Sequence, residues 1–287
     1  MSSESIFSKL WVIESLPDGD LKTGTALVEN HLRDIQKDNP SLHLALERPR
    51  TKADLIQLLH KIRDETIEEG LYPLLHFECH GCPDGLGVAS GELVTWDELR
   101  EILIEINQAC KLNLVVILAA CNGVHLIKVA TKMDRAPFWA VIGPEKEITA
   151  GEAKHDFSVF YSVFFKDLDG DEAIEALNGG VKNGDRKYHF LSAEGLFARA
   201  YRRYYKSHCI GKGRRERIEN LVTQAMKNPD VRRMGVKWVR DKIKQGLSEE
   251  DKHFAKLKNR FFFIDLFQEN AARFKIKRDD IIESSEP

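Results

Sequence analysis

Long apolar runs are absent from this sequence of 287 residues. No stretch approaches the ~20 consecutive apolar residues that a membrane-spanning helix requires, so we expect no membrane partner. The opening segment, MSSESIFSKL, is polar and lacks the apolar run of a secretion signal. The chain also contains no internal repeat and no low-complexity segment, which excludes a repeat architecture.

Cysteine is scarce and odd in number, with five residues at positions 79, 82, 110, 121 and 209. Cys110 and Cys121 lie on or beside predicted core elements. Disulfide frameworks belong to oxidising compartments, whereas this pattern fits a reduced one. We therefore expect a cytoplasmic protein without a disulfide framework.

The formal net charge of −2 conceals an uneven distribution. Residues 1–186 contain 19 Lys and Arg against 31 Asp and Glu, whereas residues 187–287 contain 24 against 14. An acidic body with a basic tail indicates two regions with different roles, or two that attract each other. We predict an α/β domain over residues 1–190 and a basic, mainly helical extension over residues 191–287.

Strand and helix patterns alternate through the first region. The expected strands are short and apolar on both faces, which is typical of a parallel sheet covered by helices on each side. We therefore predict an α/β fold in which helices flank a mainly parallel sheet in three layers. The strands are expected at Leu10–Leu16, Leu42–Glu47, Tyr72–Glu78, Leu114–Ala120 and Phe138–Ile142, with an edge strand at Tyr188–Ser192, and the helices at Thr23–Asp34, Lys52–Glu69, Thr95–Cys110, Val124–Lys132, Thr149–Phe165 and Asp171–Leu177.

Two of these strands end in residues with reactive side chains. One runs into a Cys-His-Gly sequence at His80, and another into a Cys-Asn-Gly sequence at Cys121. The carboxyl ends of parallel strands meet at one edge of a sheet, so we expect His80 and Cys121 on the same rim. A cysteine attacks a carbonyl carbon when a nearby base takes its proton. His80 is the candidate base, Cys121 the nucleophile, and the amides of Gly81 and Cys121 the candidate oxyanion donors.

The two strand ends resemble those of a known family. FECHG at Phe77–Gly81 and ILAACNG at Ile117–Gly123, followed by the strand and helices of Ala140–Leu177, are similar to the caspase–hemoglobinase clan and to its bacterial CHAT-type branch, which is related to separase. The resemblance covers roughly residues 8–190. It implies a caspase-like fold and a thiol endopeptidase with Cys121 as nucleophile and His80 as general base and then acid. The Gly81 and Cys121 amides would form the oxyanion hole.

The same resemblance implies how such an enzyme is used. Its substrate would be a protein, and no cofactor or metal would be needed. CHAT-type peptidases are often latent until an activating protein, complex or other signal arrives. They commonly act in bacterial defence, against viruses for example, or in programmed cell death.

Departures from the caspase pattern concern the residue before the cleaved bond. Caspases bind an acidic side chain there through a glutamine and an arginine, which correspond here to Ala119 and to the acidic turn after the first strand. Cleavage after aspartate is therefore not expected. Our hypothesis is a basic residue in that position, attracted by Asp18, Asp20 or Glu145. Asn122 either lines the substrate cleft or only forms the turn.

The segment around His80 also permits other chemistry. Cys79 and Cys82 have CxxC spacing with His76 nearby, as in a redox pair or half a zinc site. No second Cys/His pair completes four ligands, and proline and glycines follow where a redox motif usually opens a helix. Gly85–Gly87 lacks the third glycine of a dinucleotide loop and is interpreted as a flexible active-site loop.

The basic extension has two interpretations. Its expected helices, near residues 193–205, 214–227, 229–245 and 249–260, present a solvated basic face, with an exposed turn at 211–215, a buried segment at Phe261–Ile264 and a frayed tail from Arg278. Alternatively it is a docking surface for an acidic partner or for nucleic acid. The alternative to a peptidase is a catalytically silent caspase-like scaffold that binds a partner through this extension. The cations and interleaved tyrosines concerned are Arg202, Arg203, Lys206, Lys212, Arg214 and Arg215, and Tyr201, Tyr204 and Tyr205.

Overall fold

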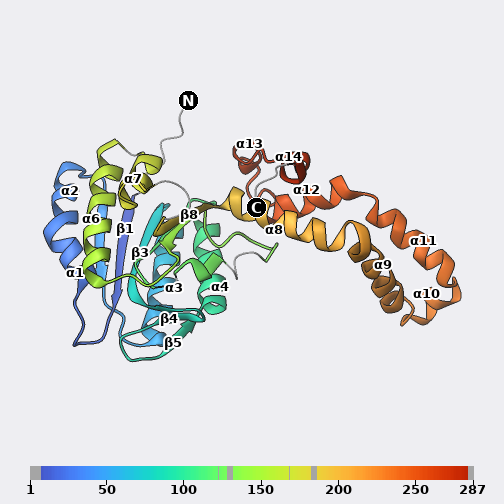
Figure 1. Ribbon diagram of the computed structural model, residues 1–287, viewed down its shortest axis with the longest axis horizontal. Helices are drawn as coiled ribbons and strands as arrows, with labels where there is room; N and C mark the ends of the chain where they lie inside the picture. Colours follow the sequence, from blue (N-terminus) through green and yellow to red (C-terminus); the bar gives the residue numbers. More distant parts are fainter. Residues whose placement is uncertain (1–7, 122, 128–131, 168, 182–185, 284–287) are drawn as a thin grey trace. The chain divides into compact units, whose positions relative to one another are not determined.

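The computed structural model describes residues 8–121, 123–127, 132–167, 169–181 and 186–283 (Figure 1). Its contacts divide the chain into two compact units. The first comprises residues 1–130 and 136–193, and the second residues 131–135 and 194–287. The main division therefore falls at Ala193.

A mixed β-sheet forms the centre of the first unit. Its main path follows the order β2-β1-β3-β6-β7-β8. The first five strands are parallel to their neighbours, and β8 pairs antiparallel with β7 at the edge. The α/β fold with a mainly parallel sheet is thus confirmed. The strands are β1 (Lys9–Ser15), β2 (His43–Glu47), β3 (Pro73–Cys82), β6 (Val115–Leu118), β7 (Ala140–Pro144) and β8 (Tyr188–Ser192).

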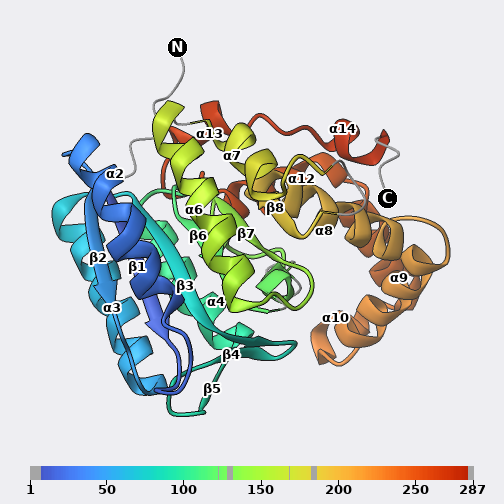
Figure 2. The same cartoon turned by 60° about the vertical axis from the view of Figure 1, so that its left-hand side comes forward.

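Helices cover both faces of this sheet, which gives the three layers that the apolar strands predict (Figures 1 and 2). On one face α6 (Ala150–Asp167) packs with α7 (Gly170–Leu177) and α1 (Thr23–Leu27). A π-helical turn, Val28–Leu32, joins α1 to α2 (Arg33–Asp38). On the other face α3 (Lys52–Glu69) packs with α4 (Trp96–Ala109).

Threonine caps determine where α3 and α4 begin. Thr51 accepts a hydrogen bond from the Asp54 amide, and the Asp54 carboxylate accepts from the Thr51 amide in return. Thr95 and Glu98 form the same capping box before α4. The buried residues of α3 are Leu55, Leu58, Leu59, Ile62 and Thr66. Ile67 is 62% exposed, and the neighbouring Thr66 is buried instead.

Strand β3 is longer than its apolar pattern predicts. It continues past Glu78 to Cys82 and turns into the short strands β4 (Gly85–Gly87) and β5 (Leu93–Thr95). The interpretation of Gly85–Gly87 as a flexible loop is therefore wrong. A β-carbon at Gly85 would lie 2.1 Å from the Val94 carbonyl oxygen, so glycine is there because two strands approach closely.

The second unit is helical and builds its own aromatic core. Phe197 contacts the rings of Phe254, Phe261 and Phe262, so the predicted burial of the Phe261 segment is confirmed. The predicted turn at 211–215 is instead the first turn of a helix, and residues 278–283 of the predicted frayed tail form a further helix. The helices are α8 (Ala193–His208), α9 (Gly211–Ala225), α10 (Pro229–Arg233), α11 (Val236–Leu247), α12 (Glu250–Phe261), α13 (Asn270–Arg273) and α14 (Arg278–Glu283).

Membrane insertion was also considered for each helix. Within the ranges given above, none combines the length and the apolar composition that crossing a bilayer requires.

Candidate active site

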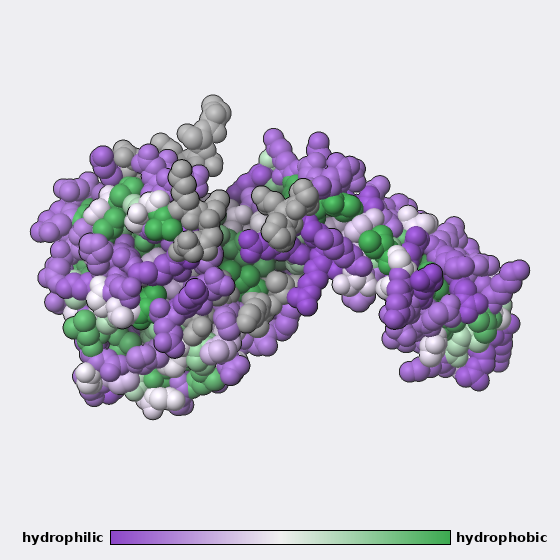
Figure 3. All heavy atoms as spheres, in the orientation of Figure 1, coloured by the Kyte–Doolittle hydropathy of each residue, from purple (hydrophilic) through white to green (hydrophobic). Residues whose placement is uncertain are grey.

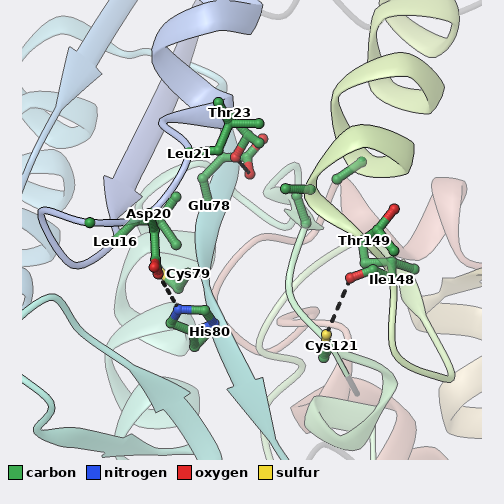
Figure 4. Close-up of a pocket in the computed structure, with 14 residues that line it drawn as sticks. Leu16, Asp20, Leu21, Thr23, Glu78, Cys79, His80, Cys121, Ile148 and Thr149 are labelled. Atoms are coloured by element: carbon green, nitrogen blue, oxygen red, sulfur yellow. Dashed lines mark hydrogen bonds and ion pairs between the residues drawn. The ribbon is translucent and has the colours of Figure 1, made fainter.

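A pocket of about 330 Å³ lies in the first unit, beyond the carboxyl ends of β1, β3 and β6 and beside the start of α6 (Figure 4). This is the edge where open α/β sheets usually bind ligands. Its lining contains both candidate catalytic side chains. The full lining is Leu16, Gly19, Asp20, Leu21, Thr23, Glu78, Cys79, His80, Ala119, Cys121, Ile148, Thr149, Ala150 and Ala153.

His80 lies on the extension of β3, and an aspartate orients its ring. The His80 Nε2 atom is 2.6 Å from Oδ2 of Asp20, and the imidazole side chain is 63% exposed. A carboxylate only accepts hydrogen bonds, so Nε2 carries the proton and donates a hydrogen bond to Asp20. The neutral ring then keeps Nδ1 as its acceptor. Nδ1 is therefore the nitrogen that is available as a base.

The loop that positions Asp20 is held by its own hydrogen bonds. The Asp20 amide donates to the Pro17 carbonyl over 3.0 Å. The Lys22 ammonium donates to the carbonyls of Leu16 and Pro17, each over 2.6 Å. These bonds hold the turn after β1 against the end of that strand. The Asp20 carboxylate is thus placed beside His80 by a short, braced loop.

Cys121 follows β6 and faces the same pocket. The Ala119 amide donates to the Phe77 carbonyl over 2.9 Å, which continues the pairing of β6 with β3 almost to the cysteine. The thiol is partly exposed, and its Sγ atom is 3.7 Å from the Ile148 carbonyl oxygen. In the part of the chain that the structure describes, the thiol and the His80 imidazole do not hydrogen-bond to each other.

Gly81 brings the backbone of β3 against the backbone of Cys121. A β-carbon at Gly81 would lie 1.8 Å from the Cys121 carbonyl oxygen and 3.0 Å from its amide nitrogen. Only glycine permits this approach. The β3 backbone and the segment after β6 therefore meet at Gly81 and Cys121, the two residues predicted to supply oxyanion donors. Gly81 itself does not line the pocket. The role of the two amides as oxyanion donors stays a prediction.

Of the other predicted substrate-binding residues that the structure describes, one lines the pocket and two do not. Ala119 lines the pocket, but Asp18 forms a two-bond ion pair with Arg50, at 2.8 and 2.9 Å, and is not among the lining residues. Glu145 likewise lies outside the lining, 3.1 Å from His189. The structure thus gives Asp18 and Glu145 other partners. Asn122 lies outside the described residues.

The CxxC spacing does not bring two sulfurs together. Cys79 and Cys82 both lie on β3, where residues three apart point to opposite faces and are about 10 Å apart. A disulfide requires α-carbons within about 7 Å. Cys79 is also buried, which raises its pKa to about 12. The redox and half-zinc interpretations are therefore wrong for this pair, and no cluster of three or more metal-binding side chains occurs among the residues described.

A buried network behind the pocket was missed from the sequence. His76, Glu78 and His80 alternate along β3, so all three side chains lie on the face that packs against α6. Glu78 lines the pocket and accepts hydrogen bonds from Thr23 and His76. The signal was present in the sequence, because polar residues at every second position of an apolar strand indicate a shared polar face.

Neither the models of protein families nor the curated proteins contain a match to this chain. The caspase-like resemblance therefore depends on the motifs and on the geometry just described.

One of the three tyrosines of the basic extension is not available for stacking on nucleic acid. Tyr201 is buried and packs against Phe197 and Phe254. Tyr204 and Tyr205 are partly exposed, and the Tyr204 hydroxyl lies 2.6 Å from an Arg217 nitrogen within the second unit. The burial of Tyr201 weakens the nucleic-acid interpretation, which depends on exposed aromatic side chains.

Proposed function

We propose that this protein is a cysteine endopeptidase in which Cys121 is the nucleophile, His80 the general base and acid, and Asp20 the residue that orients His80. One observation supports this most strongly. Three chain segments that are distant in sequence place a thiol, an imidazole and a carboxylate around one pocket, with the carboxylate bound to the imidazole. This is the arrangement that nucleophilic catalysis requires.

The first half of the reaction forms an acyl-enzyme. His80 Nδ1 takes the thiol proton, and the thiolate attacks the carbonyl carbon of the scissile bond. The carbonyl π electrons move to oxygen, which the Gly81 and Cys121 amides would bind. When the intermediate collapses, the C–N bond breaks and the imidazolium gives its proton to the leaving amine. A thioester at Cys121 remains.

The second half releases the acyl group. A water molecule gives a proton to His80 as its oxygen attacks the thioester carbon, and the C–S bond then breaks. The proton returns to the sulfur, so the enzyme is regenerated without a cofactor. Throughout, Asp20 keeps Nε2 as the protonated nitrogen and stabilises the imidazolium.

The resting geometry fits an enzyme of low basal activity that a partner or signal raises. The thiol contacts the Ile148 carbonyl rather than the free Nδ1 atom of His80, so the reactive pair is not yet joined. Catalytic hydrogen bonds often shorten only when substrate binds. An activating protein or signal that moves the segment before α6 would release the thiol toward His80.

Proteolysis of a diverse peptide pool tests this proposal. The wild-type protein should cleave the pool, and Cys121→Ala and His80→Ala should both abolish cleavage. The matched control is Cys209→Ala, which removes a thiol from the second unit and should leave cleavage intact. Cleavage that persists in both active-site variants would refute the assignment.

One surface favours a second candidate, a scaffold that binds an acidic segment of a partner protein. Residues 232–238, RRMGVKW, are all exposed, and Met234, Val236 and Trp238 are 53%, 43% and 44% exposed. Apolar side chains lie among hydrophilic ones over α9–α11 (Figure 3). Cations beside exposed apolar groups suit an acidic amphipathic partner. For a scaffold, Trp238→Ala would abolish partner binding, and Cys121 would alkylate no faster than the other exposed thiols.

A further inference from the structure

Glu78 is a buried carboxylate in the wall of the Cys121 pocket, and the proton transfers described above do not use it. Its side chain is 3% exposed and lies two residues before His80 on the same face of β3. Figure 4 shows Glu78 and Thr23 toward one end of the group of lining residues, with His80 and Cys121 toward the other. Burying a charge without a counter-ion is costly, so the position of this group requires a reason.

The hydrogen bonds around Glu78 all run toward its carboxylate. The Tyr161 hydroxyl and Nδ1 of His76 are 2.9 Å apart and form one hydrogen bond. Nε2 of His76 lies 2.9 Å from Oε1 of Glu78 and donates to it, because a carboxylate only accepts hydrogen bonds. Thr23 Oγ1 lies 2.7 Å from Oε2 and donates to it. The network therefore fixes the carboxylate and leaves its negative charge in place.

The neighbouring buried carboxylate, Glu14, has an arginine partner. Glu14 lies opposite Glu78 in the register of β1 and β3, and its side chain is 1% exposed. It accepts two hydrogen bonds from Thr25 and lies 3.4 Å from Arg48. Glu78 has no lysine or arginine partner among the side chains described. Within the described part of the chain its partners are only His76 and Thr23, one on each oxygen, so each oxygen keeps a lone pair for a donor that enters the pocket.

The rest of the lining suits a long side chain with a charged end. Leu16, Leu21 and Ile148 offer apolar surface for an alkyl stem. The alanines at 119, 150 and 153 leave the space unobstructed. A cavity of about 330 Å³ is large enough for one such side chain.

We propose that Glu78 determines specificity, and that the pocket binds the arginine or lysine side chain of the residue whose carbonyl is attacked. This inference rests on the proposed peptidase function for its substrate. The sequence suggested Asp18 and Glu145 as residues that attract a basic side chain. The inference assigns that role to Glu78, which lies within the pocket. A carboxylate with free lone pairs binds guanidinium by charge-assisted hydrogen bonds.

The first test measures binding and needs no turnover. Pentylguanidine and its neutral analogue pentylurea are compared for protection of Cys121 against iodoacetamide in the full-length protein. Pentylguanidine should protect at a concentration on the order of 10²-fold lower than pentylurea, because only the cation gains the carboxylate. Equal protection by the two compounds, or no protection by either, would overturn the inference.

Glu78→Gln and Glu14→Gln form the matched pair of variants. Each removes one buried negative charge from adjacent strands at the same register. Only Glu78→Gln should lose the advantage of pentylguanidine, whereas Glu14→Gln should keep it. If both variants keep it, the inference is wrong. If Glu78→Gln does not fold, the comparison of pentylguanidine with pentylurea on the wild-type protein still tests the inference.

A second test separates this inference from the peptidase proposal. Peptides that differ only in arginine, lysine, norleucine, glutamine or aspartate before the scissile bond are compared by kcat/KM. Arginine and lysine should exceed norleucine on the order of 10²-fold, and Glu78→Gln should remove most of that ratio. Cleavage without a basic preference would refute the inference alone. Selective protection by pentylguanidine together with a Cys121 alkylation rate that His80→Ala leaves unchanged would refute the peptidase proposal alone.

Discussion

The orientation of the His80 ring is the residue-scale feature on which the chemistry depends. Asp20 occupies Nε2 at 2.6 Å and so leaves Nδ1 as the base. Asp20 had been predicted as a substrate-binding residue, and its contact with His80 gives it a positioning role. Nothing in the local sequence distinguishes Asp20 from Asp18, because the turn contains both and only the fold decides which carboxylate meets the imidazole.

Asp20→Asn should lower kcat/KM on the order of 10²-fold, since an asparagine amide can donate to Nε2 and favour the tautomer with its proton on Nδ1. The pH profile of kcat/KM should change with it. Asp18→Asn is the matched control, because it removes the same charge from the same turn but breaks only an exposed ion pair with Arg50. An equal loss in the two variants would show that charge alone, rather than ring orientation, is responsible.

Burial makes Cys79 inert although it lines the same pocket as Cys121. Because burial raises the Cys79 pKa to about 12, only ~10⁻⁴ of this thiol is ionised at pH 8. We expect iodoacetamide at pH 8 to label Cys121 and to spare Cys79 in the native protein, as measured by peptide mass spectrometry. The urea-unfolded chain should label both cysteines. Rapid native labelling of Cys79 would contradict this description of the pocket.

At the scale of elements, the extension of β3 into the β4 hairpin holds His80 beside Cys121. Periodicity predicts the apolar part of β3 well, because burial on both faces leaves a clear pattern. It misses the extension, because the pairing of Gly81 with Leu86 and of Cys82 with Gly85 is set by a partner strand rather than by hydrophobicity. A glycine in a strand indicates close approach of another backbone, and Gly81 and Gly85 both fit that rule.

Gly81→Ala should destabilise the protein and abolish peptide cleavage. Its β-carbon would lie 1.8 Å from the Cys121 carbonyl oxygen, so the backbone must move. Gly87→Ala is the control within the same hairpin, because its β-carbon would meet His80 Cβ at an ordinary 3.6 Å. Urea unfolding monitored by circular dichroism, together with peptide cleavage, would measure both effects. Similar behaviour of the two variants would contradict the proposed close approach.

The start of α6 forms one side of the pocket and is held by a capping box. Thr149 and Glu152 exchange hydrogen bonds, and Lys187 lies 2.9 Å from the Glu152 carboxylate. The ammonium of Lys187, with the amide and hydroxyl of Thr149, lowers the pKa of Glu152 from 4.5 to about 2. Thr149→Ala should cost about 1 kcal/mol of unfolding free energy, as is usual for a lost N-cap.

The depressed pKa of Glu152 predicts how this cap depends on pH. A carboxyl with a lower pKa in the folded state stabilises the fold above the unfolded pKa, and the effect is lost as pH falls through the folded one. The wild-type advantage over Glu152→Gln should therefore be full above pH 4.5 and disappear between pH 4.5 and 2. Thermal unfolding from pH 2 to 7 would measure it. An advantage that does not change with pH would contradict the assignment.

At the scale of the whole molecule, local sequence patterns predicted most helices and strands. The contact partners of individual side chains could not be predicted without the folded structure. The ranges of α3, α4 and α6 followed closely from sequence. Glycines at 211 and 213 suggested a turn, yet Gly211 has a φ of 57° and serves as the first residue of α9. The ion pair of Asp18 with Arg50 joins residues 32 positions apart, and no spacing rule reveals it.

The candidate site exists only in the folded first unit, because Asp20, His80 and Cys121 come from three separate loops and strands. The most direct test of the central claim is therefore the rate at which iodoacetamide alkylates Cys121 in the native wild-type protein and in native His80→Ala, measured from pH 5 to 9. We predict that the wild-type rate exceeds that of His80→Ala by at least about tenfold near neutral pH, because only a base within reach raises the thiolate fraction. Identical rates across this range would mean that His80 does not act on Cys121, and the proposed peptidase chemistry would be wrong.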